Sequence, residues 1–400
     1  MAVRWEGTQN LARCSLGRAA MEPLIHAFRS AALATLDRVS TAEVLAGFLR
    51  GGISTISLAG NPVLKRRTML DVVAVVGTEK HGRPGVDPLD WLAFASTGAV
   101  REAKWRGARL VPATMASKPE GTANVVAAIR RALAEAQSQG LSIANAAHLL
   151  IGLATDEGND ARLLLESLGL DAAQFADRFR NSADYRVARA PWVPAVRDLG
   201  LFGAISNPGL GRLYAALALR MSSKGAFGPF LYAASKEMSR QAVLFGRTEI
   251  WTADVILAVD QLDVQLALAG HRTPPGMPSR NTAATVLAQH GFRYDLAVER
   301  LAHIEEAFTP HVHESRDDWP RARRDDPRWG QRVVERFDRA RADSAARGHR
   351  DTGTTHLLAA TLAESDSSAV HLLRALSIDV NAVRVDLEHD LRESGAGRSG

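Results

Sequence analysis

Cysteine and long apolar runs are scarce in this chain of 400 residues, and each scarcity excludes a class of protein. The one cysteine, Cys14, has no partner within the chain, so an intramolecular disulfide is excluded. No stretch approaches the roughly 20 consecutive apolar residues that a membrane-spanning helix requires. Arg4, Glu6 and Arg13 precede any apolar block, which is not the pattern of a secretory signal. We therefore expect a cytoplasmic protein.

Motifs for catalysis and for metal binding are also missing. A nucleotide-binding P-loop needs Gly-x-x-x-x-Gly-Lys followed by Ser or Thr, and no such run occurs. A hydrolase elbow of the Gly-x-Ser-x-Gly type is absent as well. His311, His313 and Glu314 stand close together, but no second ligand set follows at zinc-like spacing, which favours a charged linker. We predict a protein that is not an enzyme and that holds neither a metal nor a cofactor.

Hydrophobic residues are plentiful, at 46% of the chain, although aromatic residues supply only 6%. That composition is sufficient for packed helices. A chain of 400 residues suggests two or three domains, at about 100–200 residues each. The formal net charge of +5 permits attraction to acidic partners but bears on association rather than on fold.

The last part of the chain has the pattern of four short amphipathic helices. The first is predicted over residues 332–346 and is closed by Gly348, because glycine readily takes the positive φ that helix ends favour. Thr354 is expected to cap the second helix. The third and fourth are predicted over 368–376 and 380–391, where apolar residues recur at helical spacing.

The same unit occurs elsewhere in the chain, and this repetition is the most informative feature of the sequence. The segment Asn-Ala-Ala-His-Leu-Leu at 145–150 aligns with Gly-Thr-Thr-His-Leu-Leu at 353–358, and Gly140 aligns with Gly348. Further copies are readable, one in Gly246, 252–259 and 281–292 and a fainter one at 40–49, where Ser40 and Glu43 have the spacing of a capping box.

The repeated pattern resembles the Clp N-terminal domain repeat, which sits as a double repeat at the front of Clp ATPases. The similarity is specific over 353–391 and 140–178, and weaker over 227–304 and 20–60. The resemblance implies an all-α fold of paired four-helix repeats that binds peptides, adaptors or other small ligands without chemistry of its own. Because the P-loop is missing, the chain resembles only the recognition part, as a stand-alone protein that lacks the AAA+ ATPase modules.

One departure from that family concerns its ligand. In Clp unfoldases that bind phosphoarginine, the Glu of Gly-Thr-Glu-His meets the guanidinium, a charge-assisted contact that a neutral residue cannot replace. At that place this chain has Ala42, Ala147, Ala253 and Thr355. The resemblance therefore favours an apolar or mixed ligand surface over phosphoarginine docking of the usual kind.

We expect an all-α protein whose tandem four-helix Clp N-domain-like repeats form two double-repeat domains. The first domain spans 1–180, with a divergent first repeat and an inserted segment at 60–120. A linker that holds Pro191 and Pro194 covers 181–206, and the second domain spans 207–400. Residues 51–88 stay open, because their β-branched runs suit either strands or a third helix followed by a loop.

The favoured function is non-enzymatic binding. The chain would hold peptide, adaptor or cyclic-peptide ligands of the Clp protease system, antibiotic sequestration included, as an accessory or decoy factor. Clp ATPase or protease components are its expected partners. Candidate ligand contacts lie where the first helices begin, at Thr122, Phe227, Tyr232 and Trp329. Core packing and helix capping are the alternative roles of these four side chains.

A second hypothesis is a ligand-responsive DNA-binding regulator that uses the basic amino-terminal half. A helix predicted over 92–110 carries the cations Arg101, Lys104, Arg106 and Arg109. These side chains would contact phosphates, and binding would weaken steeply with salt. The same charges suit a solvated helix face. Nucleic-acid sites usually combine such charge with a base-reading helix or stacking aromatic residues, and here Trp105 alone offers little support.

Overall fold

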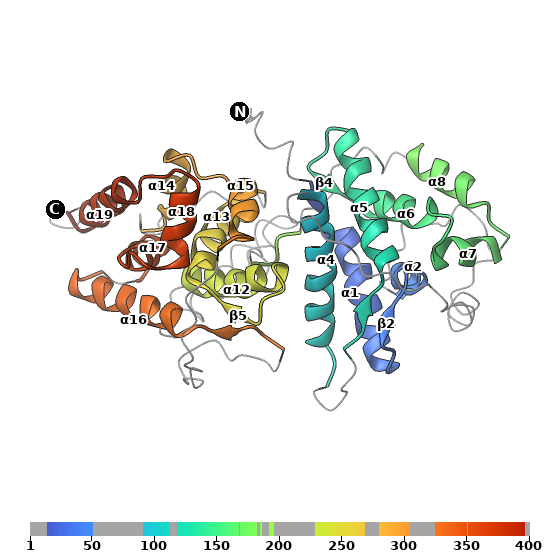
Figure 1. Ribbon diagram of the computed structural model, residues 1–400, viewed down its shortest axis with the longest axis horizontal. Coiled ribbons are helices and arrows are strands. Elements are labelled where there is room, and N and C mark those ends of the chain that lie inside the picture. The colour runs from blue at the N-terminus through green and yellow to red at the C-terminus, as the bar shows by residue number, and fades with distance from the viewer. Residues whose placement is uncertain are drawn as a thin grey trace, which may run out of the picture. The chain divides into compact units, whose positions relative to one another are not determined.

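Helices dominate every part of the chain that the computed structural model describes, namely residues 14–50, 91–112, 118–167, 169–181, 185, 192–195, 229–268, 280–304, 325–349 and 351–396 (Figure 1). The chain divides into two compact units, Met1–Trp192 and Val193–Gly400. The predicted helical fold is confirmed for these residues. Residues 51–88, whose conformation the sequence left open, lie outside them.

The first unit contains seven helices within its described residues: α1 (Arg18–Leu33), α2 (Thr41–Arg50), α4 (Trp91–Ala108), α5 (Ala123–Ser138), α6 (Ala146–Ala154), α7 (Asp160–Ser167) and α8 (Ala172–Arg180). Helix α4 lies within the segment that the sequence predicted as an insertion, and it packs on α1 and α5. Its bounds agree with the helix predicted over 92–110.

The second unit contains eight helices within its described residues: α12 (Pro229–Leu244), α13 (Thr252–Leu268), α14 (Ala283–Gln289), α15 (Tyr294–Leu301), α16 (Gln331–Ala346), α17 (Thr354–Leu362), α18 (Ser368–Ala375) and α19 (Val380–Ala396). The last four correspond to the predicted C-terminal helices. One detail differs from the prediction, because Gly353 rather than Thr354 is the N-cap of α17.

Short parallel strand pairs hold helix starts together. Each strand has two residues and ends just before a helix, and the pairs are β1 (Ser15–Leu16) with β4 (Ile143–Ala144), β2 (Arg38–Val39) with β3 (Glu120–Gly121), and β5 (Glu249–Ile250) with β6 (Arg328–Trp329). Because the pairing is parallel, the two helices that follow a pair begin at the same end of the unit. In this way α1 begins beside α6, α2 beside α5, and α13 beside α16.

Four long helices, α1, α5, α12 and α16, end in the same turn. The second residue after each helix has a positive φ: 55° at Thr35, 70° at Gly140, 72° at Gly246 and 68° at Gly348. The next amide then donates to a carbonyl in the last helical turn, as from His349 N to Ser344 O at 2.9 Å. This is the Schellman arrangement, which satisfies carbonyls that a helix end would otherwise leave unpaired.

Apolar side chains at helical spacing fill the core of each unit. In the first unit the fully buried side chains include Phe28 of α1, Leu133 of α5 and Leu149 and Leu150 of α6. In the second they include Phe337 of α16 and Leu357 and Leu358 of α17. Each such burial stabilises the fold by roughly 1.5–3 kcal/mol. Helices α6 and α17 are therefore core elements, and the repeated His-Leu-Leu segments lie inside.

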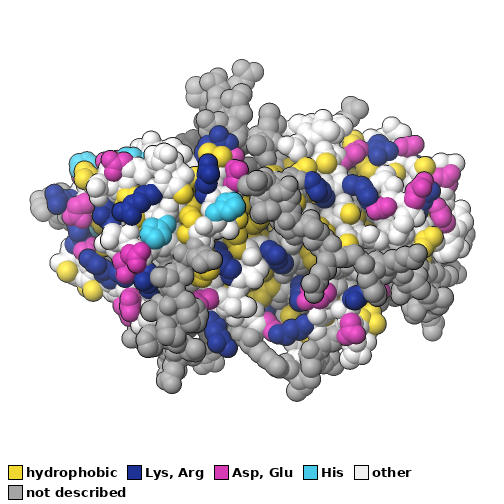
Figure 2. All heavy atoms as spheres, viewed as in Figure 1, with side chains coloured by type: hydrophobic (Ala, Val, Ile, Leu, Met, Phe, Trp, Pro, Cys, Tyr) yellow, Lys and Arg dark blue, Asp and Glu magenta, His cyan; other side chains and the backbone are white. Residues whose placement is uncertain are grey.

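Charged side chains of both signs are mixed on the face shown in Figure 2, without one dominant basic area among the described residues. None of the described helices has the length and apolar character needed to cross a membrane.

Candidate functional site

The repeated sequence motif forms the same hydrogen bond at the start of four helices. The side chain three residues after the N-cap residue accepts a hydrogen bond from the backbone amide of that N-cap residue. The four bonds join Ser40 N to Glu43 Oε2 at 2.6 Å, Asn145 N to His148 Nδ1 at 3.1 Å, Trp251 N to Asp254 Oδ2 at 2.8 Å, and Gly353 N to His356 Nδ1 at 3.2 Å. Each bond satisfies an amide at a helix start. The motif histidines are thus structural acceptors.

The two motif histidines are buried, and burial disfavours their charged form. Desolvation lowers the pKa of His148 and of His356 from 6.5 to about 4 in each case. Both imidazoles are therefore neutral near pH 7. Burial likewise raises the pKa of the Cys14 thiol to about 12, so this thiol is not a ready nucleophile. Within the described residues, no group of three or more His, Cys, Asp or Glu side chains is placed to hold a metal ion.

The position that carries Glu in the resembled motif is closed in this chain. Ala147, Ala253 and Thr355 are buried there, and so is Ala42. The Thr355 hydroxyl accepts from the Thr282 amide at 3.0 Å. The position therefore packs against its own unit.

Hydroxyl groups connect the start of one helix to the start of another that is distant in sequence. Thr252 Oγ1 of α13 lies 2.9 Å from Ser368 Oγ of α18 and accepts from the Ala369 amide at 3.3 Å. In the first unit, Thr41 Oγ1 of α2 accepts from the Ala161 amide of α7 at 3.0 Å. Both units thus use the same contact between corresponding helices.

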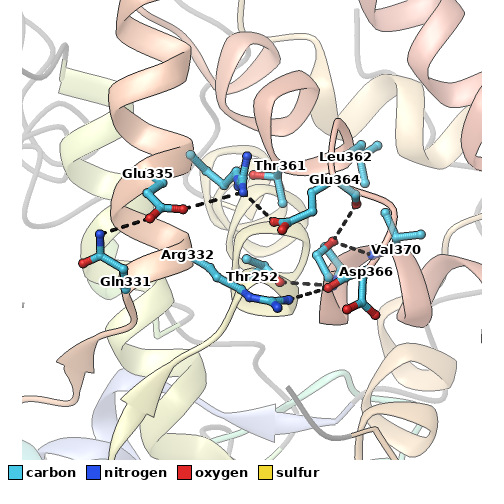
Figure 3. A network of polar contacts seen from close by, with 12 residues as sticks. Thr252, Gln331, Arg332, Glu335, Thr361, Leu362, Glu364, Asp366 and Val370 are labelled. Carbon is cyan, nitrogen blue, oxygen red and sulfur yellow. Dashed lines mark hydrogen bonds and ion pairs between the residues drawn. The ribbon is translucent and has the colours of Figure 1, made fainter. Parts of the chain in front are cut away.

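The start of α16 gathers an aromatic side chain and several charges. Trp329 is half-buried, pairs through its backbone with Ile250, and meets the Phe337 ring edge to face at 5.7 Å. Figure 3 shows the polar network that continues from this point along α16 to the turn before α18. Its main contacts run from Gln331 Nε2 to Glu335 Oε1 at 3.1 Å, from Arg336 to Glu364 at 2.5 Å, and from Arg332 to the Asp366 carbonyl.

The aromatic and charged groups at this place form what we call the α16 start surface, defined by Trp329, Gln331, Arg332, Glu335 and Glu364. Arg332 is exposed in its contact with Asp366, and Glu335 is half exposed. Sequence reasoning found only Trp329. The signal that it missed is the spacing of Gln331 with Glu335 and of Arg332 with Arg336, which places two polar pairs on one side of the helix.

The other predicted ligand contacts have mixed placements. Thr122 is the N-cap of α5, and its side chain accepts from the Val125 amide at 3.4 Å, so it has a capping role. Tyr232 is half-buried on α12, with the Lys236 ammonium 5.4 Å from its ring centre. Phe227 lies outside the described residues. These predictions of ligand contact stay predictions.

Three of the four cations proposed for nucleic acid lie on α4 and Arg109 directly follows it, and several of them contact other parts of the first unit. Lys104 pairs with Glu120, and Arg106 pairs with the buried Glu102 at 2.8 Å. Arg109 lies over the Trp105 ring at 4.7 Å. Burial lowers the pKa of the Arg101 guanidinium below its ordinary value. The DNA hypothesis also stays a prediction, but much of this charge is already engaged.

Comparisons with known proteins bear on the C-terminal part. Searches against curated proteins and against solved structures gave no match. A family model does match, however, and it covers α16 to α19 together with Trp329 and Gly330 before them. Residues 329–397 are a Clp repeat (R) N-terminal domain.

Proposed function

We propose that this chain is a non-enzymatic binding protein of the Clp system that holds a peptide, adaptor or cyclic-peptide ligand as an accessory or decoy factor. The observation that carries the proposal is the Clp repeat at residues 329–397. A domain of that kind suggests a protein-binding role connected with Clp proteins. These 400 residues contain no P-loop motif, which agrees with binding as their role.

The α16 start surface is the proposed contact region. A half-buried tryptophan beside exposed charged groups is a common composition for the centre and rim of a protein interface. Trp329 would pack against an apolar side chain of the ligand. Arg332 would meet a carbonyl or carboxylate, and Glu335 would meet a donor group. This chemistry suits a mixed peptide segment.

We further propose that each unit is a pair of four-helix repeats, so that the chain holds two double repeats. Support comes from features that recur at matching places. These are the positive-φ turns after the long helices, the motif hydrogen bonds at helix starts, and the parallel strand pairs. Local propensity does not require such agreement between separate segments, whereas duplication of one module does.

A phosphoarginine ligand held in the manner of the Clp unfoldases has little support here. The Thr355 side chain is buried and its hydroxyl is bonded to Thr282, while alanine occupies the other three matching positions. A neutral, enclosed position offers nothing to a guanidinium. The ligand is therefore proposed to be recognised by apolar and mixed contacts instead.

Binding of purified Clp components to the full chain tests this proposal. The immobilised chain is exposed to lysate, captured Clp proteins are identified, and purified components are then titrated in competition with Clp-binding peptides. Trp329→Ala is expected to weaken binding by at least about tenfold, as for an interface hot spot. Trp91→Ala, on α4 of the first unit, is the matched control, since Trp91 is also half-buried, and it should bind like the parent. Failure to retain any Clp component or peptide would contradict the proposal.

A further inference from the structure

A hollow on the second unit lies apart from the α16 start surface. Its volume is about 390 Å³, and it is formed by the C-terminal half of α16 and the segment that follows the helix. The polar side chains that line it are Asp338, Arg341, Ser344, His349 and Thr352. None of the residues of the α16 start surface lines it. The hollow therefore calls for an explanation separate from the proposed protein contact.

The hydrogen bonds behind the hollow determine where the imidazole protons sit. The Gly353 amide donates to Nδ1 of His356 at 3.2 Å, so Nδ1 carries the lone pair and the neutral ring has its proton on Nε2. Nε2 of His356 lies 2.8 Å from Nδ1 of His349, and it must be the donor in this contact. Nδ1 of His349 is then an acceptor, which places the proton of His349 on its own Nε2.

Nε2 of His349 is the hydrogen-bond donor that this hollow offers to a ligand. Among the described residues Nε2 of His349 has no hydrogen-bond partner, yet it is not among the fully enclosed unpaired atoms. Since His349 lines the hollow, this N–H is available to a molecule that enters it. Arg341 lines the same hollow, and Arg280 and Arg347 are close enough to help burial lower the pKa of His349. These three guanidinium groups outnumber the two nearby carboxylates, Asp338 and Asp343.

The first unit shows that the helix start does not need the second histidine. His148 makes the same bond to its N-cap amide, at 3.1 Å from Asn145 N, but Leu141 stands where the second unit has His349. Nε2 of His148 is buried without a hydrogen-bond partner. The His148 ring stacks on the Tyr185 ring, with 4.9 Å between the ring centres. The helix cap therefore forms without a relay. The relay in the second unit has an effect that the first lacks, which is a fixed donor at the surface of a hollow.

We propose that this hollow binds a small ligand through an anionic oxygen, carboxylate or phosphate, that accepts from Nε2 of His349 with the Arg341 guanidinium beside it. A charge-assisted bond of this kind is stronger than one between neutral groups. The volume of about 390 Å³ admits a small organic acid or a phosphate ester. The inference does not depend on the binding of Clp proteins.

Histidine NMR on the intact chain tests the inference. Long-range proton–nitrogen spectra of the ¹⁵N-histidine-labelled protein at neutral pH report the tautomer of His349 directly. Sodium acetate and sodium phosphate are then titrated separately, with chloride keeping the ionic strength constant. We expect the His349 Nε2 resonance to shift and saturate with at least one of the two anions, at a dissociation constant of about 1–10 mM. Acetate alone would identify carboxylates as the ligand class, and phosphate alone would identify phosphates.

Two variants and one internal control complete the experiment. Arg341→Gln should weaken the anion at least about fivefold while the tautomer persists. In the parent the anion should also shift the resonances of His356, whose Nε2 lies 2.8 Å from Nδ1 of His349, and His349→Leu, which reproduces Leu141 of the first unit, should abolish this shift. The buried His148 resonance should not move with either anion. A proton on Nδ1 of His349, the absence of saturation with both anions, or equal affinity in Arg341→Gln would each overturn the inference.

Discussion

Thr252 and Ser368 are 116 positions apart in the sequence, and their hydroxyl oxygens lie 2.9 Å apart within the second unit. Ser368 Oγ also accepts from the Ala253 amide at 2.9 Å, and Thr252 Oγ1 accepts from the Ala369 amide at 3.3 Å. The two hydroxyls thus satisfy amides at the starts of α13 and α18, which have no partner within their helices. This exchange fastens helices from different parts of the chain to each other.

Thr252→Val is expected to lower the free energy of unfolding by about 1–3 kcal/mol, because it leaves buried donors unsatisfied. Thr361→Val is the matched control. The Thr361 hydroxyl is also buried, but it donates to the Leu357 carbonyl of its own helix at 2.7 Å. Loss of the Thr361 hydroxyl should cost less than about 1 kcal/mol, because the Leu357 carbonyl also accepts a backbone hydrogen bond within the helix. Urea unfolding measures both, and equal losses would argue against the importance of the contact between helices.

Gly152 is expected to tolerate no side chain. A Cβ at this position of α6 would lie 2.3 Å from the Ala128 carbonyl oxygen of α5. Gly152→Ala should therefore destabilise the protein by about 1–3 kcal/mol, as overpacking does, despite the better helix propensity of alanine. At Gly158 the nearest atom would be Asp156 Oδ1 at 3.9 Å, so Gly158→Ala should change stability by less than about 0.5 kcal/mol. Thermal unfolding of the two variants checks the contrast, and a neutral Gly152→Ala would refute the close approach of α5 and α6.

Thr35 has a φ of 55°, whereas glycine occupies the corresponding turns after α5, α12 and α16. A β-branched residue in this region is strained. Thr35→Gly should consequently raise the free energy of unfolding by up to about 1 kcal/mol, since relief of strain exceeds the added chain entropy. Gly140→Ala, which introduces a side chain at a φ of 70°, should have the opposite sign. Two changes of the same sign, measured by denaturant unfolding, would contradict this account.

Acid should destabilise the fold through the motif histidines. The pKa of His356 is lowered from 6.5 to about 4 by burial, first of all, and by His349 nearby. The unfolded chain therefore binds a proton between about pH 6.5 and pH 4 that the folded chain does not, so stability is present above pH 6.5 and is lost as the pH falls through this window. The loss from this histidine is on the order of 3 kcal/mol. His148, with a pKa also lowered to about 4, should contribute a similar loss.

His356→Gln separates this effect from other acid effects. The glutamine amide oxygen can accept from the Gly353 amide but does not titrate, so the slope of stability between pH 6.5 and pH 4 should become shallower by roughly half of the histidine contribution. Urea midpoints measured across this range provide the comparison. An unchanged slope would show that His356 is already accessible to protons in the folded state.

DNA binding is expected to be absent at low salt. Lys104 and Arg106 of α4 are each paired with a carboxylate of the chain, and Arg106 also lies between the rings of Trp105 and Trp192. Gel-shift titrations at two salt concentrations test this expectation. Retardation at low salt that disappears steeply at high salt would instead support the DNA-binding hypothesis, because phosphate contacts release counterions.

The candidate site was only partly visible in the sequence. Trp329 was found because it precedes a predicted first helix, and the C-terminal family match includes it. The partners of Arg332 and Arg336 were not found, because Asp366 and Glu364 reach them from the segment between α17 and α18 through tertiary packing. For Thr122 the structure shows the capping role that the sequence also allowed, and the predicted ligand contact stays a prediction.

The sequence by itself determined the helices, their ends and the repeated motif, because apolar spacing, glycines such as Gly140 and Gly348, and the motif histidines act over a few residues. Only the tertiary structure decided which helix starts lie together, as Thr252 with Ser368, and where the His356 proton points. Such relations depend on how a folded chain brings distant segments to within hydrogen-bonding distance, and no local pattern of residues encodes that distance.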